Sequence, residues 1–384
     1  MKEIPFHKPH ITEEEIAGVV EALKSGWLTM GPQTLKFEEE FSHFLGSKHS
    51  ISLNSCTAAL HLALKVIGLD REDEVIVPTT TFTSTAEVVC YFGAKPVIVD
   101  VERDTHNIDV SCVERAITDR TRAIIPVHFA GQPCDMDEIM NIAEQRRLHV
   151  IEDAAHAIPA KYHDRYIGTI GDMTCFSFYA TKTLTTGEGG MITTANDAWA
   201  ERLRSIRQHG ISKDAWKRYS KEGSWYYEVL EAGYKYNMTD IQASLGLAQL
   251  KKQQWMLDER NRIADKYTEA FKDSDFIGVP LIKPGRSSAW HLYIIKLNIE
   301  ALRINRADFI EELKALGIGT SVHFIPLHRH PFYRETFACN EKDFPNAEWV
   351  YERSVSLPVY PGMTDSDIER VIDAVSGVAL NNKR

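Results

Sequence analysis

Residues 149–156 read HVIEDAAH, and residues 173–194 read MTCFSFYATKTLTTGEGGMITT. Three short runs inside these stretches, 149–153, 173–179 and 190–194, are rich in apolar and β-branched residues and lack a regular alternation of apolar and polar positions. Runs of this kind are typical of strands that are covered on both faces. We therefore predict that these residues form strands of an α/β sheet that is covered on both faces.

Similar strand patterns precede these stretches and alternate with helical patterns. Strand and helix in alternation predict a largely parallel sheet with right-handed crossovers, and ligands then bind at the carboxyl ends of the strands. The further predicted strands are 50–53, 74–78, 96–101 and 123–129, and the predicted helices between strands are 57–67, 84–92, 110–117 and 136–148.

The two ends of the chain predict further elements. A helix over 13–25 is indicated by a capping box of Thr12 and Glu15, by an apolar stripe and by a stop at Gly26. A long helical stretch over 239–272 is expected to bridge two domains, which we place at 1–250 and 251–384. The second would be a smaller α/β domain with strands 291–297 and 321–325, a helix 306–316 and a last helix after Thr364.

Composition excludes several classes of protein. The chain has 384 residues, a net charge of −10, 43% hydrophobic residues and 26% charged residues, which is ordinary for a globular enzyme. Its basic residues are scattered, so we expect no nucleic-acid partner. The six cysteines show no paired spacing and the sequence has no apolar stretch of about 18 residues, so we expect a cytoplasmic protein with no membrane partner.

Common catalytic motifs are missing from the sequence. We find no dinucleotide-binding or P-loop glycine pattern, no Gly-x-Ser-x-Gly and no His-Glu-x-x-His. His323, His328 and His330 lie close together, but they span a predicted strand end and a proline-containing loop. We therefore interpret them as loop or substrate-facing histidines and predict no metal site.

Two residues at strand ends are candidates for chemistry. Asp153 ends one predicted strand and is followed by two alanines, which leave room for a flat ligand; a helix cap is the alternative. Lys182 emerges after the next strand, where a solvated surface lysine is the alternative. The glycine-rich segment 187–190 then allows a close backbone approach, although a simple turn explains it equally well.

Taken together, several strings resemble the pyridoxal-phosphate (PLP) sugar aminotransferases of the DegT/DnrJ/EryC1/StrS family. The resemblance covers nearly the whole chain, in order and at ordinary spacing. The strings are SGWLTMGP (25–32), SLNSCTAALHLAL (52–64), PVHFAGQPCDMD (126–137), IEDAAHA (151–157), FSFYATKTLTTGEGGM (176–191), GYKYNMTDIQASLGLAQL (233–250) and GIGTSVHFIPLH (317–328).

The resemblance implies a PLP-dependent transferase of fold type I, with a mostly parallel seven-stranded sheet and a smaller C-terminal α/β domain. It implies a Schiff base between Lys182 and the cofactor, with Lys182 also moving a proton during transfer. Asp153 would keep the pyridine nitrogen protonated. His156 would lie near the ring hydroxyl, and Phe82 would stack on the ring.

The resemblance also implies a phosphate site and a shared active site. The backbone of Thr57 and Ala58, at a helix start, and the hydroxyl of Ser177 would hold the phosphate. Asn237 corresponds to an asparagine that reaches the phosphate from the other subunit, so a homodimer is implied. Thr29 and His323 are the implied substrate-binding residues.

The substrates implied by the family are nucleotide-linked keto-sugars, with glutamate as donor and 2-oxoglutarate as product, in amino-sugar biosynthesis for cell-surface polysaccharides. The strings around His156 and His323 resemble members that aminate C-4 of a sugar linked to uridine diphosphate (UDP). The segment 211–224, with four basic residues, is a candidate for the sugar diphosphate or a solvated loop. A 3-keto-sugar or cyclitol aminotransferase and an idle PLP-binding regulator are the alternatives.

Overall fold

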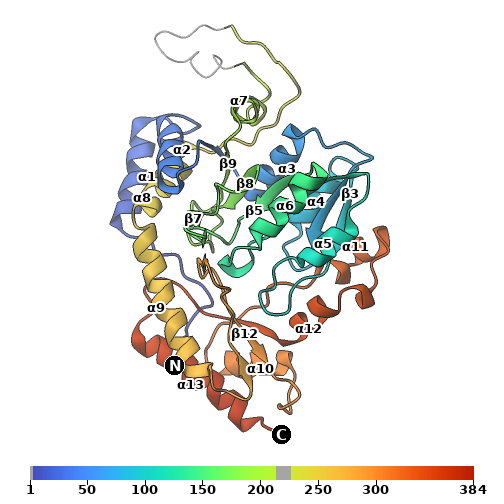
Figure 1. Cartoon of the computed structure of the whole chain (residues 1–384). Coiled ribbons are helices and arrows are strands. Elements are labelled where there is room, and N and C mark those ends of the chain that lie inside the picture. Colours follow the sequence, from blue (N-terminus) through green and yellow to red (C-terminus); the bar gives the residue numbers. More distant parts are fainter. Residues whose placement is uncertain (1–2, 213–225) are drawn as a thin grey trace.

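The computed structural model describes residues 3–212 and 226–384, and its centre is a seven-stranded sheet (Figure 1). The strand order is β1-β9-β8-β5-β4-β2-β3. All pairs from β8 to β3 are parallel, whereas β9 is antiparallel to both β1 and β8. The predicted mostly parallel sheet is confirmed. Its strands are β1 (His49–Leu53), β2 (Glu74–Pro78), β3 (Lys95–Val99), β4 (Thr121–Ile124), β5 (His149–Asp153), β8 (Met173–Ser177) and β9 (Gly190–Thr194).

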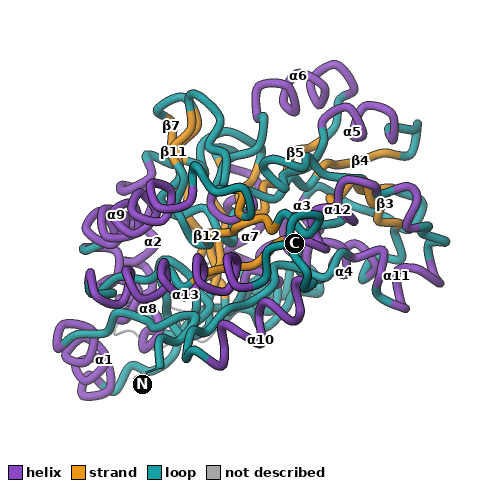
Figure 2. The backbone as a smooth tube through the Cα atoms, turned by 90° about the horizontal axis from the view of Figure 1, so that it is seen from below, coloured by secondary structure: helices purple, strands orange, loops and turns teal. Residues whose placement is uncertain are grey.

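Helices cover both faces of this sheet, as the apolar runs predicted (Figure 2). Successive residues of one strand enter two different cores: Val75 and Val77 of β2 pack into one cluster and Ile76 into the other. The same division separates Ile151 from Val150 in β5. The helices around the sheet are α1 (Glu13–Ser25), α2 (Pro32–Leu45), α3 (Cys56–Val66), α4 (Ser84–Cys90), α5 (Val110–Ala116), α6 (Met136–Arg146), α7 (Asp197–Ile206) and α8 (Asp240–Lys251).

The predicted capping box of α1 is present. The Glu15 carboxylate accepts from the Thr12 amide at 2.7 Å, and Gly26 ends the helix with a φ of 75°. A buried contact from 209 residues away fixes the following segment, because Asp240 accepts from the Gly31 amide at 2.7 Å. A Cβ on Gly31 would lie 2.8 Å from that carboxylate, so the close approach requires glycine.

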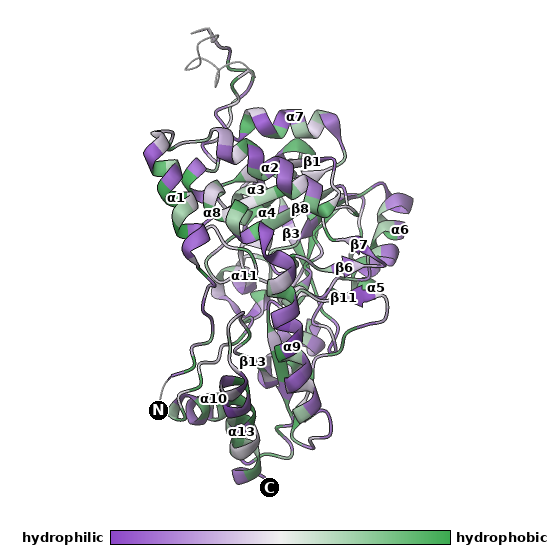
Figure 3. Ribbon diagram, turned by 90° about the vertical axis from the view of Figure 1, so that its left-hand side faces the viewer, coloured by the Kyte–Doolittle hydropathy of each residue, from purple (hydrophilic) through white to green (hydrophobic). Residues whose placement is uncertain are grey.

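A smaller C-terminal body lies beyond the sheet, and the long helix α9 leads to it (Figure 3). Its antiparallel sheet has the order β10-β12-β13, packed between helices. The remaining elements are α9 (Gln253–Phe271), β10 (Ile277–Gly278), β12 (Tyr293–Leu297), α10 (Arg306–Ala315), α11 (Pro331–Thr336), α12 (Pro345–Arg353), β13 (Ser354–Leu357) and α13 (Asp365–Asn381), with a small sheet of β6 (Lys161–Tyr162), β7 (Arg165–Tyr166) and β11 (Arg286–Ser287).

Two predicted elements differ from the structure. The stretch 239–272 is helical, as expected, but it forms two helices, because α8 ends at Lys251 and α9 begins at Gln253, with Lys252 at φ −103° and ψ 12° between them. The run 321–325 forms only an isolated bridge, from Ser321 to Ser356. The third strand of the C-terminal sheet is β13, which the sequence analysis did not identify.

Other predictions are confirmed or stay open. Thr364 caps α13 as expected. The domain boundary at 250 stays a prediction, and the break at Lys252 lies beside it. Most of the basic segment 211–224 lies outside the described residues. Among the described helices, none combines the length and apolarity that crossing a membrane requires.

Candidate active site

Several of the predicted site residues lie together at one edge of the sheet. The carboxyl ends of β1, β2, β4, β5 and β8 all point to this edge, because β9 is antiparallel to both of its neighbours. Asp153 is the last residue of β5, and Ser177 is the last of β8. Lys182 follows in a turn, where its amide donates to the Tyr179 carbonyl at 2.9 Å. The structure thus brings the two strand-end candidates together.

Asp153 is 4% exposed and has no cationic partner in direct contact in the described part of the chain. Its Oδ2 accepts from the Thr85 hydroxyl at 2.7 Å, and its Oδ1 accepts from the Ala155 amide at 3.1 Å. Burial raises the pKa of this carboxyl, and the two hydrogen bonds oppose the rise because they favour the charged form. A cationic ring nitrogen at this position would supply the missing countercharge.

Lys182 is half-buried, and its surroundings disfavour the ammonium form. Burial lowers its pKa to about 8, while the nearby Asp153 and Cys56 act in the opposite direction. An amine with a pKa near neutrality is a competent nucleophile toward an aldehyde, whereas an ordinary lysine is almost entirely protonated. The environment therefore favours Schiff-base chemistry at this residue.

This depressed pKa has a kinetic consequence that can be measured. Cofactor-free protein is expected to capture PLP at a rate that rises through a midpoint near pH 8, because only the neutral amine attacks. At that pH about half of Lys182 is neutral, against roughly 0.4% of an ordinary lysine. Stopped-flow absorbance across pH 6–11 measures the profile. A midpoint above about 10 would contradict the prediction.

His156 lies in a cluster of aromatic rings beside Lys182. Its Nδ1 accepts from the Ala130 amide at 3.3 Å, so in the neutral ring the proton is on Nε2. Burial, followed by the charge of Lys182, lowers its pKa well below the usual value. Its ring centroid is 5.9 Å from that of Phe324 and 4.4 Å from that of His291.

His323 is placed near this cluster. Its Nδ1 forms a hydrogen bond of 2.8 Å with the Ser356 hydroxyl. Burial and then the charge of Lys182 lower its pKa to about 4. Phe82, 58% exposed, lies with its ring 6.1 Å from that of Phe324, on the open side of the cluster.

The predicted phosphate site is partly occupied by the chain itself. Ser55 caps α3, and its hydroxyl oxygen accepts from the Ala58 amide at 3.0 Å. The Ser177 oxygen accepts from the Tyr179 amide at 3.3 Å, which leaves its own proton free to donate. A Cβ on Gly190 would lie 2.4 Å from the Ser55 carbonyl, so glycine there lets β9 approach the start of α3. Thr57 is half-buried in the same turn.

Asn237 and Thr29 lie on neighbouring segments of the chain. Among the described residues, no contact joins Thr29 to Lys182. Thr29 is exposed, and its carbonyl accepts from the Asp240 amide at 3.0 Å. Asn237 is 8% exposed; its Nδ2 donates to the Met238 carbonyl at 3.2 Å. Its Oδ1 is buried and finds no hydrogen-bond partner in the described residues.

Several residues of this site carried little or no signal in the sequence. Thr85 could have been suspected, because it follows β2 at the same sheet edge; Thr81 in turn lies 2.7 Å from its hydroxyl and completes a chain to Asp153. His7 and His291 carried no signal, since their approach to Lys182 depends on the packing of distant segments.

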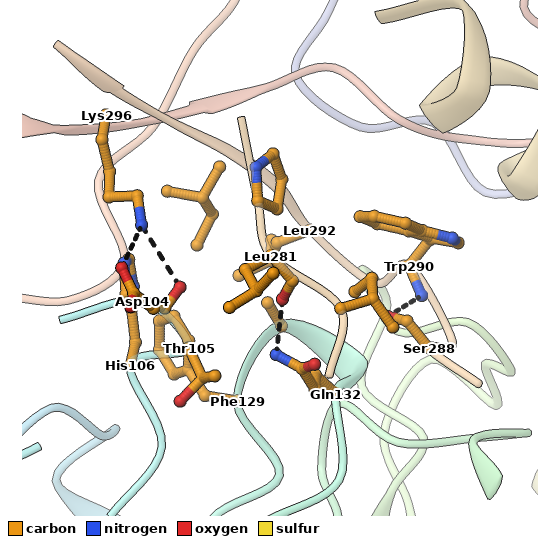
Figure 4. Close-up of a pocket in the computed structure, with 14 residues that line it drawn as sticks. Asp104, Thr105, His106, Phe129, Gln132, Leu281, Ser288, Trp290, Leu292 and Lys296 are labelled. Carbon is orange, nitrogen blue, oxygen red and sulfur yellow. Dashed lines mark hydrogen bonds and ion pairs between the residues drawn. The ribbon is translucent and has the colours of Figure 1, made fainter. Parts of the chain in front are cut away.

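A separate small cavity is lined in part by Phe129, whose ring centroid lies 5.9 Å from that of His156 (Figure 4). It measures about 30 Å³, and Phe129, His106, Leu292 and Trp290 contribute to its lining. A cavity of this size holds about one water molecule and no sugar. Lys182 and Asp153 do not line it, so it is distinct from the site at the sheet edge. No cluster of three or more metal-binding side chains was found in residues 3–212 and 226–384.

Comparison with known proteins places this geometry in a family. The model of the DegT/DnrJ/EryC1/StrS aminotransferase family matches residues 9–376. The chain is 50% identical over 376 residues to the spore coat polysaccharide biosynthesis protein SpsC of Bacillus subtilis, covering 98% of this chain and 97% of that protein. It is 58% identical over 380 residues to the uncharacterized protein MJ1066 of Methanocaldococcus jannaschii, covering 99% and 98%.

A solved structure agrees with the sequence comparison. The sugar aminotransferase Spr1654 of Streptococcus pneumoniae, described as putative and solved in its pyridoxamine-phosphate (PMP) form, superposes with a TM-score of 0.93 at 36% identity, covering 98% of this chain and 99% of that one. The same protein has been solved in its PLP form. The chain therefore belongs to the DegT/DnrJ/EryC1/StrS aminotransferase family and is a PLP-dependent sugar aminotransferase.

Proposed function

We propose that this enzyme converts a nucleotide-linked 4-keto-sugar, with UDP as the nucleotide, into the 4-amino-sugar, with glutamate as the amino donor. The observation that carries the proposal is Lys182, an amine of depressed pKa beside the buried Asp153 at the edge of the sheet where the strands' carboxyl ends lie. The 50% identity to a spore coat polysaccharide biosynthesis protein supports a role in making sugars for surface polysaccharides.

The residues present fit PLP. Asp153 is a buried carboxylate that lacks a cation, Ser177 has a free proton to donate, and the alanines after Asp153 leave room for a flat ring. When bound, PLP supplies an electron sink that stabilises the carbanion formed next to the transferred nitrogen. Phe82 would cover one face of the ring, and Thr57, Ala58 and Ser177 would hold the phosphate; the amide of Ala58 would first leave Ser55.

The chain's own residues then divide the remaining work. Lys182 Nζ would take a proton from the substrate carbon and deliver it to the cofactor carbon, for which a pKa near 8 is well matched. Thr81 and Thr85 would keep Asp153 ionised through their hydrogen-bond chain. His156 would donate from Nε2 to the ring hydroxyl, because its Nδ1 already accepts from Ala130. His323 would face the sugar.

A panel of acceptors tests the substrate assignment. PMP-loaded enzyme is mixed with UDP-linked 4-keto-sugars, 3-keto-sugars and cyclitol ketones, and the products are identified by mass spectrometry. We expect rapid amination of a 4-keto-sugar alone. Exclusive use of a 3-keto-sugar or a cyclitol would overturn the C-4 assignment, and no amination of any acceptor would favour an idle regulator.

We further propose that the enzyme is a homodimer with shared active sites. Six large apolar side chains between residues 11 and 35 are each more than a third exposed in the single chain, which is typical of an interface. They are Ile11, Ile16, Val20, Leu23, Leu28 and Leu35. Asn237 retains one free amide proton, and we assign it to the phosphate bound beside the partner subunit's Lys182.

Shared sites predict that two inactive variants rescue each other. Lys182→Ala and Asn237→Asp homodimers should both be nearly inactive, the second because the added carboxylate repels the phosphate. Heterodimers have one site with both lesions and one with neither, so mixtures should regain up to a quarter of native activity if subunits exchange at random. Subunit exchange is verified by differently tagged chains. Exchange without recovered activity, or an active monomer in sedimentation, would contradict the model.

We also propose that the enzyme acts in the cytoplasm. All six cysteines are free thiols, as is usual in a reducing compartment.

A further inference from the structure

Three buried polar atoms near the active site have no hydrogen-bond partner among the described residues. They are Nε of Arg260, Nε2 of His7 and Nδ1 of His291. Arg260 is 2% exposed and His291 is 6% exposed. Unpaired buried polar atoms are costly and rare in folded proteins, so each calls for a physical explanation.

These three residues, which we call the donor triad, come from distant parts of the chain and lie near one another. Arg260 Nη1 donates to the Trp290 carbonyl at 3.2 Å and to the Val359 carbonyl at 2.7 Å. His291 directly follows Trp290 in the chain. The ring of His7 lies 6.3 Å from that of Tyr360, and Tyr360 directly follows Val359 in the chain. The charge of Arg260 helps to lower the pKa of both histidines, which agrees with this proximity.

The donor triad adjoins the site at the sheet edge. The His291 ring centroid is 4.4 Å from that of His156. His7 also lies close to the backbone of Ala180, two residues before Lys182. The charge of Lys182 also lowers the pKa of both triad histidines. A ligand joined to the nitrogen at Lys182 could therefore reach the triad.

The electrostatics of the donor triad call for an anion. No carboxylate in residues 3–212 or 226–384 forms an ion pair with Arg260, and burial alone lowers its pKa, to about 10. The guanidinium thus stays charged at neutral pH while buried and without a countercharge. Both histidines are neutral there, and Nδ1 of His291 can present an N–H group.

We propose that Arg260, His7 and His291 form the binding subsite for a carboxylate of the α-amino-acid donor. A carboxylate matches the planar guanidinium and is small enough for a place that solvent hardly reaches. A nucleotide-linked sugar diphosphate is disfavoured as the ligand, because a subsite that held it would also need space for the attached nucleoside. The inference rests on the proposed function, because it names the group that holds the donor in that same site.

Binding without turnover tests the subsite directly. Radiolabelled glutarate, a dicarboxylate without an amine, is equilibrated by dialysis with native holoenzyme, with Arg260→Met and with the control Arg262→Met. Arg262 lies on the same helix but pairs with Glu259 and Asp365. We expect Arg260→Met to weaken glutarate binding about 30-fold or more. The glutarate affinity of Arg262→Met and the UDP affinity of Arg260→Met should each change less than about threefold.

The two half-reactions provide the second measurement. In Arg260→Met the glutamate concentration that half-converts the lysine-bound cofactor spectrum should rise by a similar factor. The reaction of PMP-loaded variant with the keto-sugar should be nearly unchanged, which a general structural defect would not permit.

Each alternative outcome is decisive. Native glutarate affinity in a folded Arg260→Met variant would overturn the subsite, and selective loss of UDP binding would assign the anion to the diphosphate. If Arg260→Met fails to fold, His7→Leu decides, because it removes one triad group and leaves both carbonyl contacts of Arg260. If native enzyme accepts no amino group from any amino acid, the proposed function fails, but the glutarate measurement still decides the subsite.

Discussion

Lys182→Ala enzyme is expected to lose transamination by a factor on the order of 10⁴ or more. The side chain is needed twice, as the amine that joins the cofactor and as the group that moves the proton, and proton transfer alone contributes about 10²–10⁴-fold. The variant should still bind PLP without a covalent bond, because the phosphate site and Asp153 are unchanged. Single-turnover absorbance measures the loss.

Borohydride reduction of native enzyme provides the control for this prediction. The reduced cofactor should be found on the peptide that contains Lys182, and Lys182→Ala should yield no labelled peptide. Labelling of a different lysine, or near-native turnover of the variant, would remove Lys182 from the mechanism.

Asp153→Asn enzyme is expected to fold and to lose turnover by roughly 10²–10³-fold, the range seen when one electrostatic group of an active site is removed. The neutral amide is nearly the same size as the carboxylate, but it cannot hold a proton on the pyridine nitrogen. Loss of the carboxylate should also lower the pKa of Lys182 further, because Asp153 is the main group that raises it.

The shift in the pKa of Lys182 separates an electrostatic role of Asp153 from a structural one. The midpoint for PLP capture should move below pH 8 in Asp153→Asn, whereas Thr85→Val should move it little, since the carboxylate remains. Unfolding is monitored by thermal denaturation. Near-native turnover in a folded Asp153→Asn variant would contradict the proposed role.

Local patterns in the sequence determined the elements of the sheet. The apolar runs at 149–153 and 173–177 became strands because each places alternate side chains in two separate cores, which only a sheet covered on both faces provides. The ends of those runs located Asp153 and Lys182, because parallel strands bring their carboxyl ends to one edge. The capping box of α1 and the start of α13 at Thr364 were likewise visible, since each involves neighbours within three residues.

Partners far apart in the chain could not be found in this way. The break at Lys252 arises where α8, which packs beside α1, gives way to α9, and there the Lys252 ammonium pairs with the buried Glu15 carboxylate. The short run 354–357 became a strand because β12 offers it a partner, while 321–325 has only one bridge. Neither choice is encoded in local periodicity.

The sequence by itself determined the fold class and the family and supplied the proposed residues of the reacting centre, because these follow from periodicity and from strings of adjacent residues. Only the tertiary structure decided what surrounds that centre. His7, Arg260 and His291 meet across more than 250 residues of chain, and the depressed pKa of Lys182 comes from burial by segments that no local pattern connects. Packing, rather than sequence order, determines which polar groups lose their contact with water, and so where an uncompensated charge calls for a ligand.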